Sequence, residues 1–106
     1  MSGHRVRLCG ADELSVGEAR AFAVDGREIC LARCASGFFA IDDVCTHEDY
    51  SLAEGELDPE ACELECWAHG SVFSLATGEP LNLPATRPVA TYAVERDGED
   101  VVVVIP

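Results

Sequence analysis

The sequence contains no lysine and no long apolar run, and it has only three histidines. Its seven basic residues are all arginines and face twenty acidic residues, which gives a formal net charge of −13. Such a charge repels nucleic acid and anionic lipid headgroups, so we expect neither as a partner. No apolar stretch approaches the roughly 20 residues that span a bilayer, and no apolar signal segment is visible. We therefore expect a cytoplasmic protein that docks to a basic protein surface.

Helix signals are also scarce, since only residues 11–18 could form a helical turn. The Asp-Gly pairs at residues 25–26 and 97–98 are strong signals of two-residue hairpins. Alternating or apolar segments predict strands at residues 6–9, 19–24, 27–33, 38–42, 91–95 and 101–105. This pattern predicts an all-β fold, an antiparallel sandwich or barrel. With 106 residues and no repeat, linker or low-complexity tract, we expect a single domain over residues 1–106.

The segment from about residue 44 to residue 84 has a different composition. It contains two Cys/His pairs, several turn signals, and prolines near its end. We interpret it as a subdomain inserted between strands of the main β unit.

The two Cys/His pairs read C-x-H and C-x-x-H, with 18 residues between them. They consist of Cys45 and His47, then Cys66 and His69. Two thiolates and two imidazoles satisfy one metal centre, and this donor set is typical of zinc or of iron–sulfur. Gly70 directly after the second pair lets the backbone turn tightly there.

The segments Cys45-Thr46-His47 and Cys66-Trp67-Ala68-His69-Gly70-Ser71 closely resemble the two cluster loops of Rieske proteins. The resemblance covers nearly the whole chain. It implies a Rieske-like β fold with an inserted cluster-binding subdomain and one [2Fe–2S] cluster. It also implies that Cys45 and Cys66 bind one iron, while His47 and His69 bind the other near the surface. Trp67 is a departure, since the family commonly has proline there.

The resemblance also indicates the subtype. High-potential Rieske proteins carry an extra cysteine in each cluster loop, and the matching residues here are Tyr50 and Ala68, which cannot form that disulfide. Phe73 stands where those relatives have a tyrosine that bonds a cysteine sulfur, whereas Ser71 is retained. Two acidic residues after His47 add negative charge. These features predict a low-potential, ferredoxin-type Rieske protein.

The function that this resemblance implies is one-electron transfer. The protein would carry electrons from a flavin-dependent NAD(P)H reductase to a terminal non-haem iron oxygenase of the aromatic-ring-hydroxylating type. We find no catalytic set beyond the cluster ligands, so we expect a carrier and not an enzyme, and we expect a monomer. Two alternatives stay open: the small Rieske-like subunit of an assimilatory nitrite reductase, and a structural Cys2His2 zinc module.

Four further cysteines have no assigned chemistry. We interpret Cys30 and Cys34 as small buried hydrophobes, leave Cys9 unassigned, and keep Cys62 as an alternative metal ligand. Trp67 is interpreted as a packing residue beside the cluster. The stretch around Pro84 resembles the family's loop that shields the cluster, and an ordinary rigid turn is the equal alternative.

Overall fold

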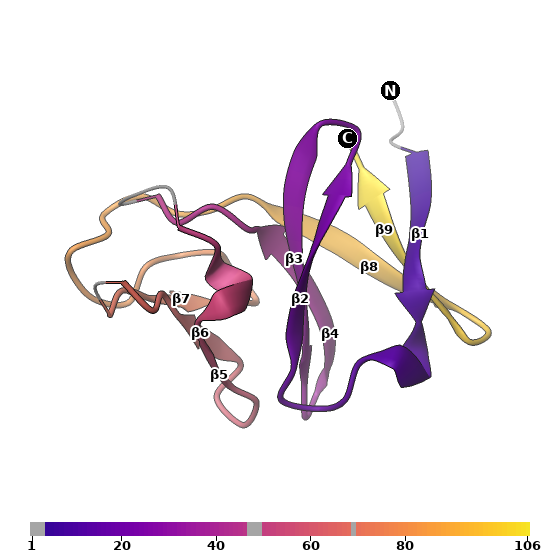
Figure 1. Cartoon of the computed structure of the whole chain (residues 1–106), viewed down its shortest axis with the longest axis horizontal. Coiled ribbons are helices and arrows are strands. Elements are labelled where there is room, and N and C mark those ends of the chain that lie inside the picture. Colours follow the sequence, from indigo (N-terminus) through magenta and orange to yellow (C-terminus); the bar gives the residue numbers. More distant parts are fainter. Residues whose placement is uncertain (1–3, 47–49, 69) are drawn as a thin grey trace.

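The computed structural model describes residues 4–46, 50–68 and 70–106, and short antiparallel strands dominate these residues (Figure 1). The two helices found there are single 3-10 turns, so no described helix could cross a membrane. In chain order the elements are β1 (His4–Gly10), η1 (Ala11–Glu13), β2 (Ala19–Val24), β3 (Arg27–Cys34), β4 (Gly37–Asp42), η2 (Leu52–Glu54), β5 (Glu56–Asp58), β6 (Glu63–Glu65), β7 (Val72–Ser74), β8 (Thr91–Asp97) and β9 (Asp100–Ile105).

Six of these strands form one curled antiparallel sheet, in the order β1-β9-β8-β4-β3-β2. The ladder between β4 and β8 is short, with only the pairs Ala40–Tyr92 and Ile41–Thr91. The two halves of the sheet therefore close over a core to which both contribute, including Ile29, Leu31 and Val103. This arrangement confirms the predicted all-β class.

The two predicted Asp-Gly hairpins are present. Asp25 and Gly26 have φ values of 51° and 77°, and they join β2 to β3. Gly98 has φ 63° and lies between β8 and β9. Positive φ at these positions explains why Asp and Gly stand there, since few other residues tolerate it.

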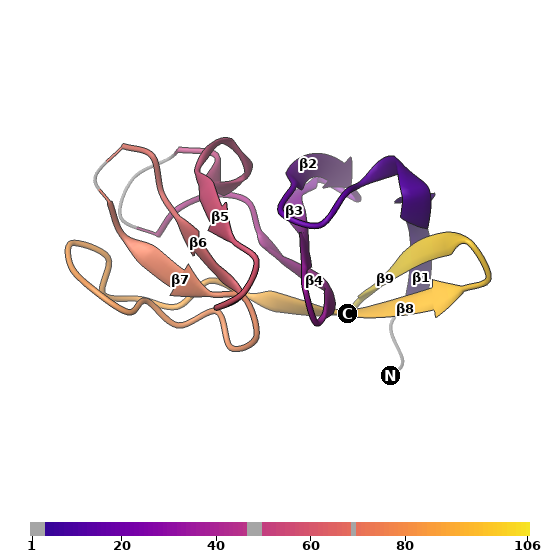
Figure 2. The same ribbon diagram turned by 90° about the horizontal axis from the view of Figure 1, so that it is seen from below.

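A second, three-stranded sheet has the order β5-β6-β7 and comes between β4 and β8 in the sequence. Figure 2 shows it beside the six-stranded sheet. Its strands are three residues long, too short for an alternation signal, and they were not predicted. Their central residues pair across the sheet, Leu57 with Leu64 and Leu64 with Phe73.

Strand β3 connects the two cores because its successive side chains point to opposite faces. Ile29 and Leu31 belong to the core of the six-stranded sheet. Cys30, Ala32 and Cys34 belong to a second buried cluster, shared with the three-stranded sheet and the loops around it. The main sheet thus packs directly against those loops through β3.

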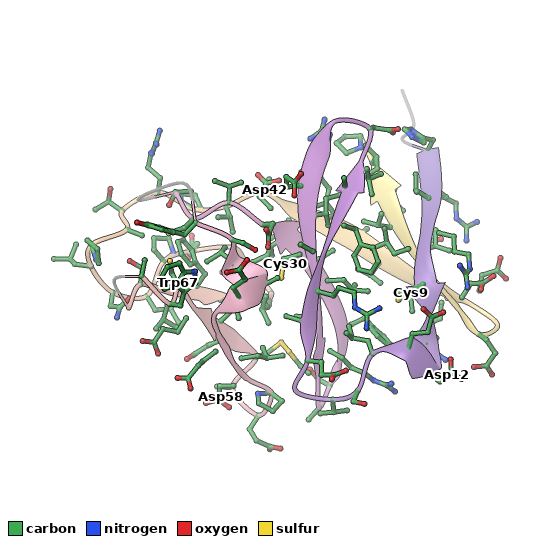
Figure 3. The ribbon with its side chains drawn as sticks, viewed as in Figure 1. Cys9, Asp12, Cys30, Asp42, Asp58 and Trp67 are labelled. Carbon is green, nitrogen blue, oxygen red and sulfur yellow. A yellow bond between two sulfur atoms is a disulfide. The ribbon has the colours of Figure 1, made fainter. Side chains whose placement is uncertain are left out.

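Cys34 forms a disulfide with Cys62, with a Cα–Cα distance of 5.5 Å (Figure 3). The interpretation of Cys34 as a simple buried hydrophobe is therefore wrong, and so is Cys62 as an alternative metal ligand. The physical reason is a contact between distant segments: the N–H of Ala35 donates to the carbonyl of Pro59 at 3.0 Å, which brings the β5–β6 turn to the end of β3. Cys30 is confirmed as a fully buried thiol outside the disulfide.

Candidate metal centre

The first loop, residues 43–52, contains Cys45 and is closed by backbone contacts. The N–H of Cys45 donates to the carbonyl of Tyr50 at 3.0 Å, and the N–H of Leu52 donates to the carbonyl of Asp43 at 2.6 Å. Val44 and Ser51 form an isolated β-bridge between these two bonds. The described residues thus form the two limbs of a narrow hairpin that places Cys45 near its tip.

The second loop, residues 64–73, is built in the same way between β6 and β7. The N–H of Cys66 donates to the carbonyl of Ser71 at 2.7 Å, so in both loops the cysteine bonds the residue five positions later. Gly70, at φ 77°, donates back to the carbonyl of Cys66 at 3.0 Å. This positive φ is why a glycine follows the second Cys/His pair, as the sequence indicated.

A third segment, residues 80–88, ties the two loops together and is called the proline segment below. The Asn82 side chain donates to the carbonyl of Gly70 at 3.0 Å, and its oxygen accepts from the N–H of Val72 at 2.7 Å. The hydroxyl of Thr46 in the first loop donates to the carbonyl of Arg87 at 2.7 Å. Asn82 and Thr46 were missed from the sequence, because only the fold brings the proline segment to the loops.

Both predicted cysteine ligands are buried, Cys45 at 3% and Cys66 at 1% exposure. They belong to the same buried cluster, together with Leu64 and Phe73. His47 and His69 lie outside the described residues. Within residues 4–46, 50–68 and 70–106 alone, no three Cys, His, Asp or Glu side chains gather in a metal-binding group.

Only two polar or charged residues of the described chain are buried, and each lies in one of the loops. Ser71 is fully buried, and its hydroxyl oxygen accepts from the N–H of Ala85 at 3.0 Å. Asp43, two residues before Cys45, is 3% exposed. Sequence reasoning singled out Ser71 but missed Asp43, because nothing in the sequence shows which face of the chain this carboxylate occupies.

Large exposed apolar side chains gather around the loops. Of the five large hydrophobic side chains exposed in the described chain, four lie in the first loop, the second loop or the proline segment: Val44, Trp67, Leu81 and Leu83. Trp67 is 54% exposed and meets the ring of Tyr50 edge to face, with centroids 4.9 Å apart (Figure 3). Trp67 therefore packs across the two loops and leaves about half of its surface exposed.

The donor set fits a thiolate-bound metal centre. Two buried thiols lie on matching hairpin loops, and backbone hydrogen bonds close each loop. Thiolates are the ligands that iron–sulfur centres and zinc prefer. The apolar surroundings would exclude water from the sulfur side of such a centre.

Comparison with known proteins distinguishes between these metals. Residues 4–93 match the model of the Rieske [2Fe-2S] domain. The ferredoxin component of biphenyl 2,3-dioxygenase from Rhodococcus jostii is 34% identical to this chain, over 92% of this chain and 89% of its own length.

Solved structures agree with that match. The ferredoxin of carbazole 1,9a-dioxygenase from Nocardioides aromaticivorans superposes with a TM-score of 0.90 at 36% identity, covering 96% of this chain and 97% of that one. A chain from a complex of reduced oxygenase and oxidised ferredoxin in carbazole 1,9a-dioxygenase gives 0.88 at 33% identity, covering 94% and 92%. A chain described as a nitrite reductase small subunit from Mycobacterium tuberculosis has a TM-score of 0.88 but 17% identity, which shows the fold alone.

Proposed function

Because this chain belongs to the Rieske [2Fe–2S] family, we propose that it is the ferredoxin of an aromatic-ring dioxygenase system. It takes single electrons from a flavin-dependent NAD(P)H reductase and delivers them to a terminal non-haem iron oxygenase. The observation that carries this proposal is the likeness, along nearly the whole of both chains, to ferredoxin components of dioxygenases. These relatives are electron-transfer subunits, and this chain likewise is a carrier and not the catalytic component.

The cofactor of the family is one [2Fe–2S] cluster, which takes up and releases one electron when bound. In the proposed ligand set, Cys45 and Cys66 hold one iron and His47 and His69 hold the other. The burial of both cysteines supports this division, because the thiolate end lies against the apolar cluster. The Ser71 oxygen accepts from the N–H of Ala85, so its hydroxyl proton would remain available to a sulfur of the bound group.

The partner surface we propose is the apolar end formed by the first loop, the second loop and the proline segment. Acidic side chains lie close by on the three-stranded sheet, where Glu56 pairs with Glu65 and Asp58 with Glu63. Like charges directly opposite each other destabilise a sheet, and a basic partner would relieve that repulsion. The oxygenase and the reductase are therefore expected to present basic rims around apolar centres.

Stopped-flow reduction of the terminal oxygenase of the same system by this protein tests the proposal. Trp67→Ala should lower the second-order rate constant about tenfold or more, as loss of an interface anchor does. Val16→Ala is the matched control, since Val16 is also 54% exposed but lies in the turn before β2. Equal effects of the two substitutions would refute the docking surface.

The rate should also fall as ionic strength rises, because the association is between opposite charges. A rate that is independent of salt would contradict the basic partner surface. Failure to reduce the oxygenase at all would refute the proposed role while leaving the cluster in place.

We further propose that the chain forms a single domain and is a cytoplasmic monomer. The two sheets share the buried side chains of β3, which supports one folding unit. Light scattering of the loaded protein should give the mass of one chain, and the mass of a dimer would overturn the monomer.

A further inference from the structure

Asp43 is the only charged side chain that is buried in the described part of the chain. Burying a carboxylate is costly unless hydrogen bonds replace the lost water. Asp43 lies two residues before Cys45 and has no place in the ligand set. Its burial therefore calls for a reason other than metal binding.

The side chain of Asp43 points to the same side of the chain as those of Ile41 and Cys45. Residues 41, 43 and 45 are buried while residues 42 and 44 are not, which is the alternation of extended chain. Ile41 and Cys45, on either side of Asp43, belong to the same buried cluster. Asp42 points the other way, and its carboxylate accepts from the hydroxyl of Tyr92.

The negative charge of Asp43 acts on a residue of this buried cluster of side chains. Burial raises the pKa of the Cys30 thiol, and the negative charge of Asp43 raises the pKa further. Cys30 belongs to the same cluster of side chains as Cys45 and Cys66. The remaining described acids and arginines are exposed or only partly buried, so water screens their charges more than that of Asp43.

The polar groups of Asp43 are all hydrogen-bonded. Its Oδ1 accepts from the N–H of Ala53 at 2.9 Å, and its Oδ2 accepts from the hydroxyl of Ser51 at 2.6 Å. Its own N–H donates to the carbonyl of Glu28 at 2.9 Å, and its carbonyl accepts from Leu52 at 2.6 Å. Two accepting oxygens suit the ionised form. The side chain thus holds the returning limb of the first loop against the limb that carries Cys45.

The second loop shows that a hairpin of this kind does not require a carboxylate. Its equivalent position, two residues before Cys66, is the fully buried Leu64 paired with Phe73. That loop therefore closes with an apolar residue at this position. What Asp43 adds to the first loop is therefore a buried carboxylate two residues from Cys45.

We propose that Asp43 is a positioning residue of the electron-transfer centre, which fixes the first loop around Cys45 and lowers the reduction potential by its buried charge. The inference rests on the proposed role of Cys45 as a ligand. Reduction adds negative charge, and a carboxylate in a low-dielectric interior opposes that addition more strongly than one in water. Dissolved salt screens surface acids but not this one.

Redox titration and electron paramagnetic resonance of the loaded variants test the inference. Asp43→Asn keeps the shape and removes the charge, so its midpoint potential should rise, and the rise should persist at high salt. Asp42→Asn removes the same charge one residue away on the opposite face, and its potential should shift less. Equal shifts in the two variants, or no shift in Asp43→Asn, would overturn the inference.

Ser51→Ala gives an independent test if Asp43→Asn loads poorly. It keeps the carboxylate but removes one donor, so the charge is less compensated and the potential should fall. A rise or no change would count against the role of Asp43.

Cys45→Ser tests the ligand assignment of Cys45 separately from the role of Asp43. If Cys45→Ser kept the wild-type spectrum, the ligand assignment itself would be wrong. If Cys45→Ser lost the spectrum while the Asp43 and Ser51 variants matched the wild type in potential and g values, only the role of Asp43 would be wrong.

Discussion

Removal of the Cys34–Cys62 disulfide should destabilise the fold without altering the electron-transfer centre. The bridge joins the end of β3 to the turn between β5 and β6 and closes a loop of 28 residues. Chain-entropy arguments give such a loop about 3.5 kcal/mol of stabilisation, acting through the unfolded state. For a chain of this size, that corresponds to a fall in melting temperature on the order of 15 °C.

The perturbation is the double substitution Cys34→Ala with Cys62→Ala, measured by urea unfolding of the loaded protein. Cys30→Ala is the matched control, because it removes a buried sulfur from the same face of β3 without breaking a cross-link. The double variant should lose clearly more free energy of unfolding than the control. Equal losses, or none, would refute the covalent link between the two sheets.

The same double variant should keep the midpoint potential of the wild type. Cys62 and Cys66 lie at opposite ends of β6, about 13 Å apart along an extended chain of four residues. A changed midpoint potential would show that the disulfide also shapes the second loop, which its distance from Cys66 argues against.

Three further predictions concern the loops and the buried thiol. Ser71→Ala should lower the free energy of unfolding by about 1–3 kcal/mol, measured in urea, because it leaves the buried N–H of Ala85 without its acceptor. Asn82→Ala should speed the loss of iron to a chelator, since it frees the second loop from the proline segment; an unchanged rate would contradict that tie. Burial raises the pKa of Cys30 above its ordinary value of 9.0, so above about pH 9 the thiol loses its proton in the unfolded chain before it does so in the folded one. The free energy of unfolding should therefore be unaffected by this thiol below about pH 9 and should fall as pH rises above it. Urea unfolding between pH 8 and 10 measures this fall, and Cys30→Ala should reduce it; an identical pH profile in that variant would contradict the assignment.

Much of the main sheet could be predicted because its signals are local. The strands β2, β3, β8 and β9 show alternation or apolar runs beside Asp-Gly turns, and the predicted and observed bounds differ by at most two residues. The three-stranded sheet could not be predicted, because a strand of three residues is too short to show an alternation of apolar and polar residues.

The candidate site divides in the same way. The spacing of Cys45 and Cys66 predicts them as ligands from the sequence, since ligand spacing is a local property, and the structure buries both in one cluster of side chains. The disulfide partners and Asn82 depend on contacts between segments far apart in the chain, which a single sequence does not reveal. Asp43 stands beside the first motif, yet its importance follows only from its burial and its hydrogen bonds.

Electron paramagnetic resonance of the purified protein, before and after dithionite reduction and with iron and sulfide analysis, tests the central claim most directly. We predict two irons and two sulfides per chain, a silent oxidised state, and a reduced signal whose average g lies below that of all-cysteine [2Fe–2S] centres. A protein with no sulfide, no signal and one zinc per chain would contradict the electron-transfer function.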